Sequence, residues 1–386
     1  MFSTCDYSAC NLINLRLNCV KRTYIFFICT HRRTSRMADK FEYSHFKDIN
    51  LDDPFFDSLK AQYEEFADWF LRKAEEKAYV LRDDDDQITG FIYLKIENEI
   101  IDDVTPQLPA AHRLKVGTFK IDAHGTRLGE RVIKKIFDHA LQENAEEVYV
   151  TVFDTHEALI SLFEKYGFIK IGTKTTPNGS ENVYLRSLRY SNNDIIKDYP
   201  LFRTSHRRKF LLAVHPEYHT ELFPDSILNN EDSSIVEDVS HTNTIHKVYV
   251  AKLSLTRMER GDLIVIYRTT DNVGPAFYRS VATSICVVEE TKKRRNFSNV
   301  EEFVRYAEAS SVFDREALIA KYNAESRLFC VKMTYNAALT RRIIRGVLLD
   351  QVGISEQPRW DLRELTDDQF NQIIELGQVN ESLIIN

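Results

Sequence analysis

The sequence predicts an α/β (α+β) fold, a mixed sheet with flanking helices, followed by a second β-barrel domain with small helices. Residues 41–188 alternate strand-like and helix-like apolar patterns, with periods near two and about 3.6 residues. Residues 206–378 show mainly short apolar runs separated by turn residues. The polar stretch "RYSNNDIIKDYP" lies between them and is typical of a linker. We therefore expect one domain at 37–190 and a second at 200–386.

Composition excludes several classes of protein. The chain has 386 residues, a net charge of −7 and 43% hydrophobic residues, which is enough for buried cores but too acidic to coat nucleic acid by bulk charge. It has no apolar run of about 18 residues, so we expect no membrane span. Of the six cysteines, four precede Met37 without a CxxC pair. We therefore expect no metal site, no disulfide framework and a cytoplasmic location.

The first 36 residues differ from the rest of the chain. The segment "LINLRLNCVKRTYIFFICTHRRTSR" mixes short apolar runs with basic residues, and Lys21 and Arg22 interrupt it. It is therefore a poor match to a signal peptide. Met37 begins "MADKFEYSHF", which reads as an ordinary cytoplasmic N-terminus. We expect residues 1–36 to be a disordered upstream extension and Met37 to be the natural start.

The first domain is expected to begin with a strand at about 41–50. A helix follows, because the apolar residues of "DDPFFDSLKAQYEEFADWFLRKAEEK" recur at helical spacing and Asp53-Pro54 can start it. Three strands, "AYVLRDD", "ITGFIYLKIENEI" and "RLKVGTFKID", come next. We then expect a helix at about 126–142, the strand "EEVYVTVF", the helix "THEALISLFEKYG" and a closing hairpin.

The second domain is expected to contain the strands "RKFLLAVHP", "KVYVAKL", "DLIVIYRT", "YRSVATSICVVEE" and "RLFCVKMTY". The polar region 225–243 carries few structural signals. Two short helices are expected within 298–322, since capping residues precede acidic side chains there. Two further helices, "TRRIIRGVLL" and "TDDQFNQIIELG", are expected around the loop "GISEQPRW".

The stretch "HGTRLGE" lies where a predicted strand passes into a predicted helix. The first turn of a helix has free N–H groups and partial positive charge, so it can bind a phosphate. Gly125 and Gly129 remove side-chain bulk there, and Arg127 adds a positive charge. By itself the pattern is more commonly explained by an ordinary strand-to-helix turn.

Two motifs resemble the GNAT superfamily of acyl-CoA N-acyltransferases over residues 40–188. The pyrophosphate loop of that family, Arg/Gln-x-x-Gly-x-Gly/Ala, aligns with residues 124–129, where His replaces its first residue and Arg its middle glycine. The second motif, Asn-x-x-Ala-x-x-Leu-Tyr-x-x-x-Gly-Phe, aligns with Thr155 to Phe168. The resemblance implies a GNAT-like fold with acetyl-CoA between two parallel strands. The implied cofactor-binding residues are Phe119, Lys120, Ile121, His124, Gly125, Thr126, Arg127, Leu128, Gly129, Glu130, Thr155 and Phe163.

The resemblance also implies direct attack of an amine on a thioester, with a base for the amine and a proton donor for the thiolate. Phe163 stands where the family often has a donating tyrosine, so the usual acid is missing. Tyr166 is the nearest substitute, although core packing explains it equally well. Glu97 is the candidate base, together with Glu99, Asp102 and Asp103, and each of these is also explained as an exposed carboxylate.

The second domain resembles a PUA-like barrel of the ASCH kind. The segments "RKFLLAVHPEYH", "MERGDLIVIYRT", "YRSVATSICVVEE" and "LFCVKMTY" carry this resemblance, but the Gly-x-Lys-x-x-Glu-x-Arg signature is absent. Such barrels bind RNA or modified bases through cationic and aromatic side chains. The implied nucleic-acid-binding residues are Arg208, Lys209, Tyr267, Arg268 and Arg279.

Together these features predict an acetyl-CoA-dependent N-acetyltransferase acting on a primary amine, with a C-terminal domain that binds RNA or recognises substrate. An aminoacyl-tRNA-type acceptor, as in toxins of a toxin–antitoxin pair, is one form of this hypothesis. Two alternatives stay open. One is a protein or small-molecule N-acetyltransferase without RNA, and the other is a non-catalytic nucleic-acid-binding regulator. The expected partners are acetyl-CoA, an amine acceptor and RNA or tRNA, with a homodimer as a further hypothesis.

Overall fold

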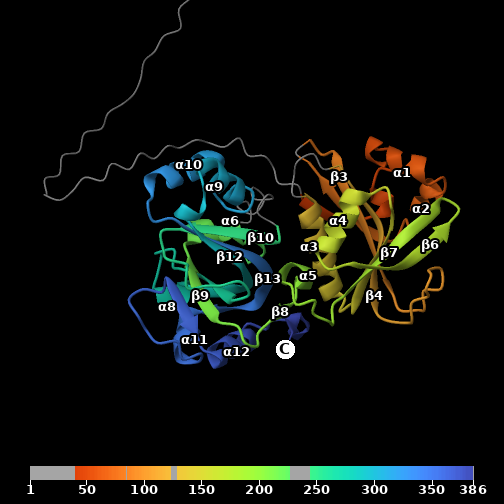
Figure 1. The fold of residues 1–386 in the computed structure, drawn as a ribbon. Helices are drawn as coiled ribbons and strands as arrows, with labels where there is room; N and C mark the ends of the chain where they lie inside the picture. The colour runs from red at the N-terminus through yellow and green to blue at the C-terminus, as the bar shows by residue number, and fades with distance from the viewer. Residues whose placement is uncertain (1–39, 84, 123–127, 227–243, 386) are drawn as a thin grey trace, which may run out of the picture. The chain divides into compact units, whose positions relative to one another are not determined.

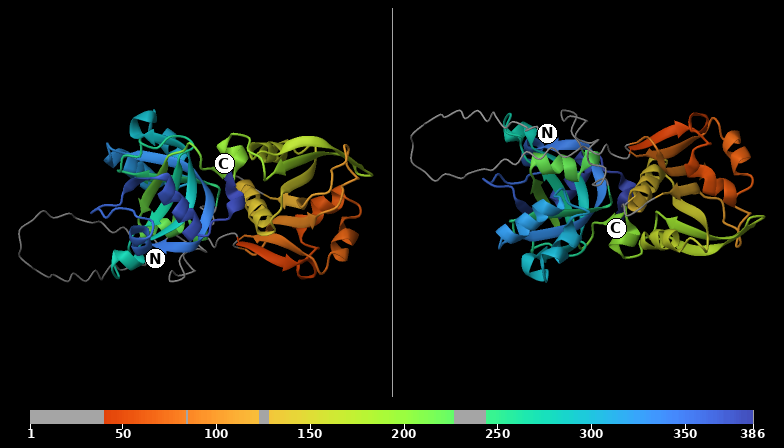
Figure 2. Two further views of the ribbon diagram at one scale, coloured as in Figure 1. Left: turned by 90° about the horizontal axis from the view of Figure 1, so that it is seen from below. Right: turned by 90° about the horizontal axis from the view of Figure 1, so that it is seen from above.

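The computed structural model describes residues 40–83, 85–122, 128–226 and 244–385. The predicted extension 1–36 and the predicted loop residues 123–127 lie outside these ranges. In the described part of the chain the strands form two main sheets, and no helix there is long and apolar enough to cross a membrane. The colours of Figure 2 show that the first sheet uses earlier residues, in red to yellow-green, and the second uses later residues, in green to blue.

The first sheet has seven strands in the order β1-β2-β3-β4-β5-β7-β6. Only β4 and β5 run parallel, and the other neighbours are antiparallel. This agrees with the predicted mixed sheet with flanking helices (Figure 1). Its elements are β1 (Lys40–His45), α1 (Asp57–Gln62), α2 (Phe66–Arg72), β2 (Lys77–Arg82), β3 (Ile88–Glu97), β4 (Arg113–Ile121), α3 (Leu128–Gln142), β5 (Glu147–Phe153), α4 (Glu157–Lys165), β6 (Ile169–Thr176) and β7 (Gly179–Ser187).

Alternation along the strands separates two cores on the faces of this sheet. Ile92 and Leu94 of β3 pack with the apolar side of α3 and α4, whereas Phe91 and Tyr93 pack with α1 and α2. This is the period of two that a sheet covered on both faces requires. The single helix expected after Asp53 is divided into a 3-10 turn and two helices. The backbone of Tyr63 is extended there and ends α1.

The second sheet has six strands in the order β10-β13-β12-β11-β9-β14. The predicted strand-rich domain with small helices is therefore present, but the ladder of described strands stays open at β10 and β14 and does not close into a barrel. Its elements are β9 (Lys209–Val214), α6 (Pro216–Leu222), β10 (His246–Ala251), β11 (Leu263–Arg268), α8 (Ala276–Arg279), β12 (Val281–Lys293), α9 (Val300–Ala307), α10 (Arg315–Ala324), β13 (Phe329–Ile344), α11 (Arg345–Asp350), β14 (Leu362–Leu365) and α12 (Asp367–Leu376).

One expected helix is wrong at its start. The segment "TRRII", predicted as helical, continues β13 as far as Ile344, and α11 begins only at Arg345. The cause is the neighbouring strand, because Val281 and Ala282 of β12 pair with Ile344 and Ile343. A ladder with a distant strand outweighs local helix propensity.

A short link, α5 (Ile195–Asp198) and β8 (Phe202–Arg203), joins the two sheets, and β15 (Ile384–Ile385) pairs with β8.

A bulge at Gly117 changes the course of β4. Tyr93 pairs with Thr118 but Leu94 pairs with Val116, so Gly117 has no partner of its own. A Cβ atom on Gly117 would lie 2.8 Å from Cδ1 of Tyr93, which is closer than real contacts allow. The bulge therefore depends on glycine, and it bends the strand near its middle.

We predict that Gly117→Ala lowers the free energy of unfolding by about 1–3 kcal/mol, because the added methyl group overpacks against Tyr93. Urea denaturation measures the change. The control is the same substitution in a Tyr93→Leu background, where the ring is gone and the added loss should be smaller. Equal losses in both backgrounds would contradict the proposed contact.

A buried carboxylate in the second sheet contacts a histidine and a lysine. Glu289 of β12 is 7% exposed, accepts a hydrogen bond from Nδ1 of His246, and lies 3.2 Å from Nζ of Lys332. Burial acts to raise the pKa of Glu289, but His246 and Lys332 outweigh it and lower the pKa below its usual 4.5. A carboxyl group with a lowered pKa stabilises the folded state above its unfolded pKa, and this stability is lost as the pH falls through the folded value.

We predict that Glu289→Gln lowers the free energy of unfolding at pH 7 by about 1.5–3 kcal/mol, the loss expected for a hydrogen bond to a charged group. The difference from the unmodified protein should shrink as the pH is lowered through the acidic range in which Glu289 takes up a proton. Chemical denaturation at several pH values measures it. Glu290→Gln is the matched control, because Glu290 is more exposed and pairs with Lys292 at 3.5 Å. A constant difference at all pH values would contradict the assignment.

Candidate active site

The parallel strands β4 and β5 separate halfway along their length. Residues 113–116 pair with 147–150, and no pairing follows beyond Val116 and Val150 among the described residues. Further along, residues 118–121 pair only with β3, and residues 151–153 pair only with β7. The facing backbone edges of β4 and β5 therefore have no strand partner in this part, which leaves hydrogen-bonding groups available to a ligand.

The predicted cofactor-binding residues of β4 lie in the separated part. The ring of Phe119 is 5.9 Å from that of Phe163, and Ile121 packs against the same core. The side chain of Lys120 leaves this face, since its ammonium donates to the carbonyl oxygen of Phe55 and lies 4.4 Å from the Phe55 ring centroid. Backbone groups, with one partly buried aromatic ring, are thus what β4 offers to a ligand.

The helix that follows β4 begins beside this part of the strand. His124, Gly125, Thr126 and Arg127 lie outside the described residues. Leu128 is buried in the core, and a Cβ on Gly129 would lie 2.9 Å from Cδ2 of Leu162 in α4. Glu130 accepts a hydrogen bond of 2.7 Å from Lys165. Gly129 therefore also permits the close approach of α3 and α4, a role that its place in the motif did not reveal.

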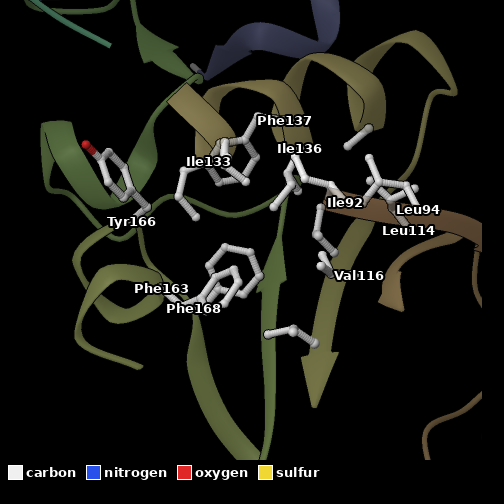
Figure 3. Packing of buried hydrophobic residues seen from close by; sticks show 14 of the residues in the cluster. Ile92, Leu94, Leu114, Val116, Ile133, Ile136, Phe137, Phe163, Tyr166 and Phe168 are labelled. Atoms are coloured by element: carbon white, nitrogen blue, oxygen red, sulfur yellow. The ribbon is translucent and has the colours of Figure 1, made fainter. Parts of the chain in front are cut away.

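Helix α4 carries the second motif. Thr155 is exposed in the turn before the helix, while Phe163 is fully buried. The rings of Phe163 and Phe168 lie 4.8 Å apart, and Figure 3 shows them together below α3. The phenylalanine at this place thus completes a hydrophobic wall and provides no proton.

Tyr166 was predicted as the substitute proton donor. Its ring is fully buried, and its hydroxyl lies 3.1 Å from Nε2 of His246 in the second sheet. In Figure 3 the hydroxyl points away from Phe163 and Phe168. Burial, together with the nearby Glu130, raises the pKa of Tyr166. The donor role stays a prediction, and the contact with His246 gives this side chain a second role, in joining the two sheets.

Glu97, the predicted base, ends β3 beside the paired part of β4. It accepts a hydrogen bond from the hydroxyl of Tyr149 and lies 3.2 Å from Nζ of Lys95 and 3.6 Å from Nζ of Lys115. Burial acts to raise the pKa of Glu97, but Tyr149 and the two lysines outweigh it and lower the pKa. The carboxylate is therefore ionised at neutral pH. It borders a cavity of about 400 Å³ whose lining includes the other predicted bases, Glu99, Asp102 and Asp103.

The structure brings together a further pair that the sequence did not indicate. The hydroxyl of Tyr63, at the end of α1, lies 3.4 Å from Oε1 of Glu181 in β7. Glu181 is opposite Phe153, in the part of β5 that has left β4. Both residues therefore border the separated strands from the side of α1. No sequence signal links them, because they lie 118 positions apart.

The five predicted nucleic-acid-binding residues make contacts within the second domain. Arg208 pairs with Asp262 at 2.8 Å, Lys209 with Asp367 at 2.6 Å, and Arg279 with Asp271 at 2.6 Å. Tyr267 and Arg268 are buried. The proposed role of these residues is untested, but their charges and rings are already in use within the fold. In the described part of the chain, no group of three or more His, Cys, Asp or Glu side chains is placed to hold a metal ion.

Comparisons with known proteins report similarities to parts of this chain. Three solved structures are among those similar to parts of this chain. A mutant form of the protein ZmASCH from Zymomonas mobilis is 12% identical over 45% of this chain and 98% of its own, with a TM-score of 0.30. The NatC complex bound to Gag peptide and CoA is 15% identical over 38% and 97%, with a TM-score of 0.27.

The third structure is Arabidopsis thaliana Naa50 in complex with the bisubstrate analogue CoA-Ac-MVNAL. It is 20% identical over 28% of this chain and 72% of its own, with a TM-score of 0.23. These low values carry no statement about activity. A comparison with curated proteins found no match. Residues 43–168, which span α1 to α4 and the separation of β4 from β5, match the acetyltransferase (GNAT) family.

Proposed function

We propose that this chain transfers the acetyl group of acetyl-CoA to a primary amine. The observation that carries the proposal is the separation of β4 and β5 after Val116 and Val150, next to the start of α3. This leaves the facing backbone edges of β4 and β5 unpaired near the start of α3. The unpaired edges suit an extended ligand arm that contains amide groups, and the helix N-terminus suits a pyrophosphate. The match of residues 43–168 to an acetyltransferase family supports the same reading.

The residues of the site would bind and orient the cofactor, which supplies an activated acetyl group as a thioester. Backbone groups of Phe119, Lys120 and Ile121 would pair with its amides, and Phe119 and Phe163 would keep water from one side. The segment from His124 to Glu130 would hold the pyrophosphate, with Thr155 in the turn before α4. This arrangement depends on backbone geometry and little on particular side chains, which fits the two departures from the family loop.

The acceptor amine must lose a proton to react. Glu97 carries an ionised carboxylate that can accept a proton directly or through water, and the contacts that lower its pKa make it a weaker base than a free glutamate. Glu181, held by Tyr63 on the α1 side of the sheet, is a second carboxylate placed to do so. The thiolate would be stabilised by amide dipoles of the site, so a strong acid is not required.

For the acceptor, we propose an amine presented with RNA, of the aminoacyl-tRNA type. The presence of a second, strand-rich domain in the same chain as the proposed transferase site supports this idea, because it offers a separate surface for acceptor recognition. Incubation with labelled acetyl-CoA and a cell extract tests it, by following the label into RNA, protein or small amines. Label in RNA that ribonuclease releases is the expected result. If the label enters only protein or metabolites, the RNA acceptor is refuted but the acetyltransferase activity stands. If no acetyl group is transferred and acetyl-CoA does not bind, the proposed acetyltransferase activity is refuted.

We predict that Gly129→Glu weakens acetyl-CoA binding at least about tenfold, because it places a negative charge at the helix N-terminus where the pyrophosphate would lie. Isothermal titration calorimetry measures the dissociation constant. Gly129→Ala is the matched control, since it meets Leu162 in the same way but adds no charge. If both variants weaken binding equally, helix packing and not phosphate binding explains Gly129.

We predict that Tyr166→Phe lowers the melting temperature but leaves kcat within about threefold, because the hydroxyl is bonded to His246 and directed away from Phe163. Thermal unfolding and initial rates measure the two effects. A fall in kcat of about a hundredfold with an unchanged melting temperature would instead identify Tyr166 as the proton donor.

A further inference from the structure

A cavity of about 810 Å³ lies in the second domain, far in sequence from the separated strands. Pockets that bind small molecules usually measure about 300–1,000 Å³. The lining includes residues of α6, β10 and α10, the segment 325–327, Arg359 and Asp361. Figure 1 shows α9 and α10 side by side with α6 beneath them. None of the five predicted nucleic-acid-binding residues is part of this lining.

Lys321 of α10 is the central charge of the cavity. Its ammonium lies 4.0 Å from the ring centroid of Phe313 and is half-buried. Among the described residues, no carboxylate forms an ion pair with it, since the nearby Glu325 pairs with Lys252. Burial lowers the pKa of Lys321 and the charge of Lys252 adds to this effect, while Glu325 and Glu217 act in the opposite direction. A partly buried ammonium group without a direct ion pair can take an anionic ligand.

Aromatic rings stand next to this ammonium. Phe313 and Tyr218 lie 5.3 Å apart at an angle of 59°, and both are partly exposed in the cavity. Tyr249 of β10 donates a hydrogen bond of 3.3 Å to the carbonyl oxygen of Ala213, which fixes its ring at the wall. Lys321 covers one face of Phe313, so the Tyr218 ring and the remaining surface of Phe313 are available to contact a flat aromatic group.

The other charged residues of the cavity lining limit how many phosphate groups a ligand can carry. Arg327 and Arg359 are exposed at the lining and add to Lys321, whereas Glu325 and Asp361 lie on the same lining. Cations suit one phosphate group, while the two acids oppose a long phosphate backbone and suit hydroxyl or amino groups of a base or sugar.

We propose that this cavity binds a small aromatic anion of the nucleoside monophosphate class, with Lys321 contacting the phosphate and Phe313 and Tyr218 contacting the base. The proposal does not rest on acetyl transfer, because it concerns a different sheet and a binding step alone. It therefore stands or fails separately from the proposed enzyme.

Calorimetric titration of the full chain with uridine 5′-monophosphate tests the proposal. We expect saturable binding, about tenfold or more weakened by Lys321→Met and by Phe313→Leu. Lys293→Met is the matched control, since it removes the same charge from outside the lining and should leave the affinity unchanged. Uridine alone and inorganic phosphate alone should each bind more weakly than the nucleotide.

Arg327→Gln provides a second test if Lys321→Met fails to fold, because Arg327 is exposed and does not support the core. It should weaken uridine 5′-monophosphate binding while the melting temperature stays unchanged. Three results would overturn the proposal. They are no binding of the nucleotide, equal affinities for Lys321→Met and Lys293→Met, and binding of a uridine oligoribonucleotide but not of the mononucleotide.

Discussion

The separation of β4 from β5 is the constraint on which the first sheet depends. Two parallel strands that begin as paired neighbours lose contact after Val116 and Val150, and the bulge at Gly117 lies at that point. Because each strand keeps its other neighbour, β3 or β7, the sheet stays intact on both sides of the gap. Helix α3, which follows β4, then begins beside unpaired backbone groups. The geometry of the two strands therefore provides the hydrogen-bonding groups of the proposed cofactor site without any particular side chain.

The helices around this gap are held by close contacts between side chains of different elements. Gly129 allows α3 to approach Leu162 of α4, and Phe163 and Phe168 fill the space beneath. Tyr166, three positions after Phe163, forms a hydrogen bond with His246 of the second sheet, and His246 forms a hydrogen bond with Glu289. The motif on α4 therefore serves the packing of both sheets as well as the proposed site. A change in the second domain at His246 reaches α4 through one hydrogen bond.

Much of the fold was accessible from sequence because apolar periodicity is a local property. The order of strands and helices between β1 and β7 followed from it. The failures have tertiary causes. "TRRII" became strand because β12 lies beside it, and the predicted barrel remained an open ladder. The pair Tyr63–Glu181 and the ion pair Lys209–Asp367 join residues 118 and 158 positions apart, which no local pattern can show.

The sequence by itself determined which segments form the first sheet. It also determined where a glycine-bearing turn leads from a strand into a helix. Both features depend on residues that are neighbours in the chain, namely those that set the strand period, the glycine positions and the helix start. Only the tertiary structure decided what the side chains face. It placed Phe163 in the core, Tyr166 against His246, and Arg208, Lys209 and Arg279 against carboxylates, while Lys321 lies beside Phe313. The physical reason is that charge pairing and burial depend on distant partners, whose approach is fixed by packing and not by local order.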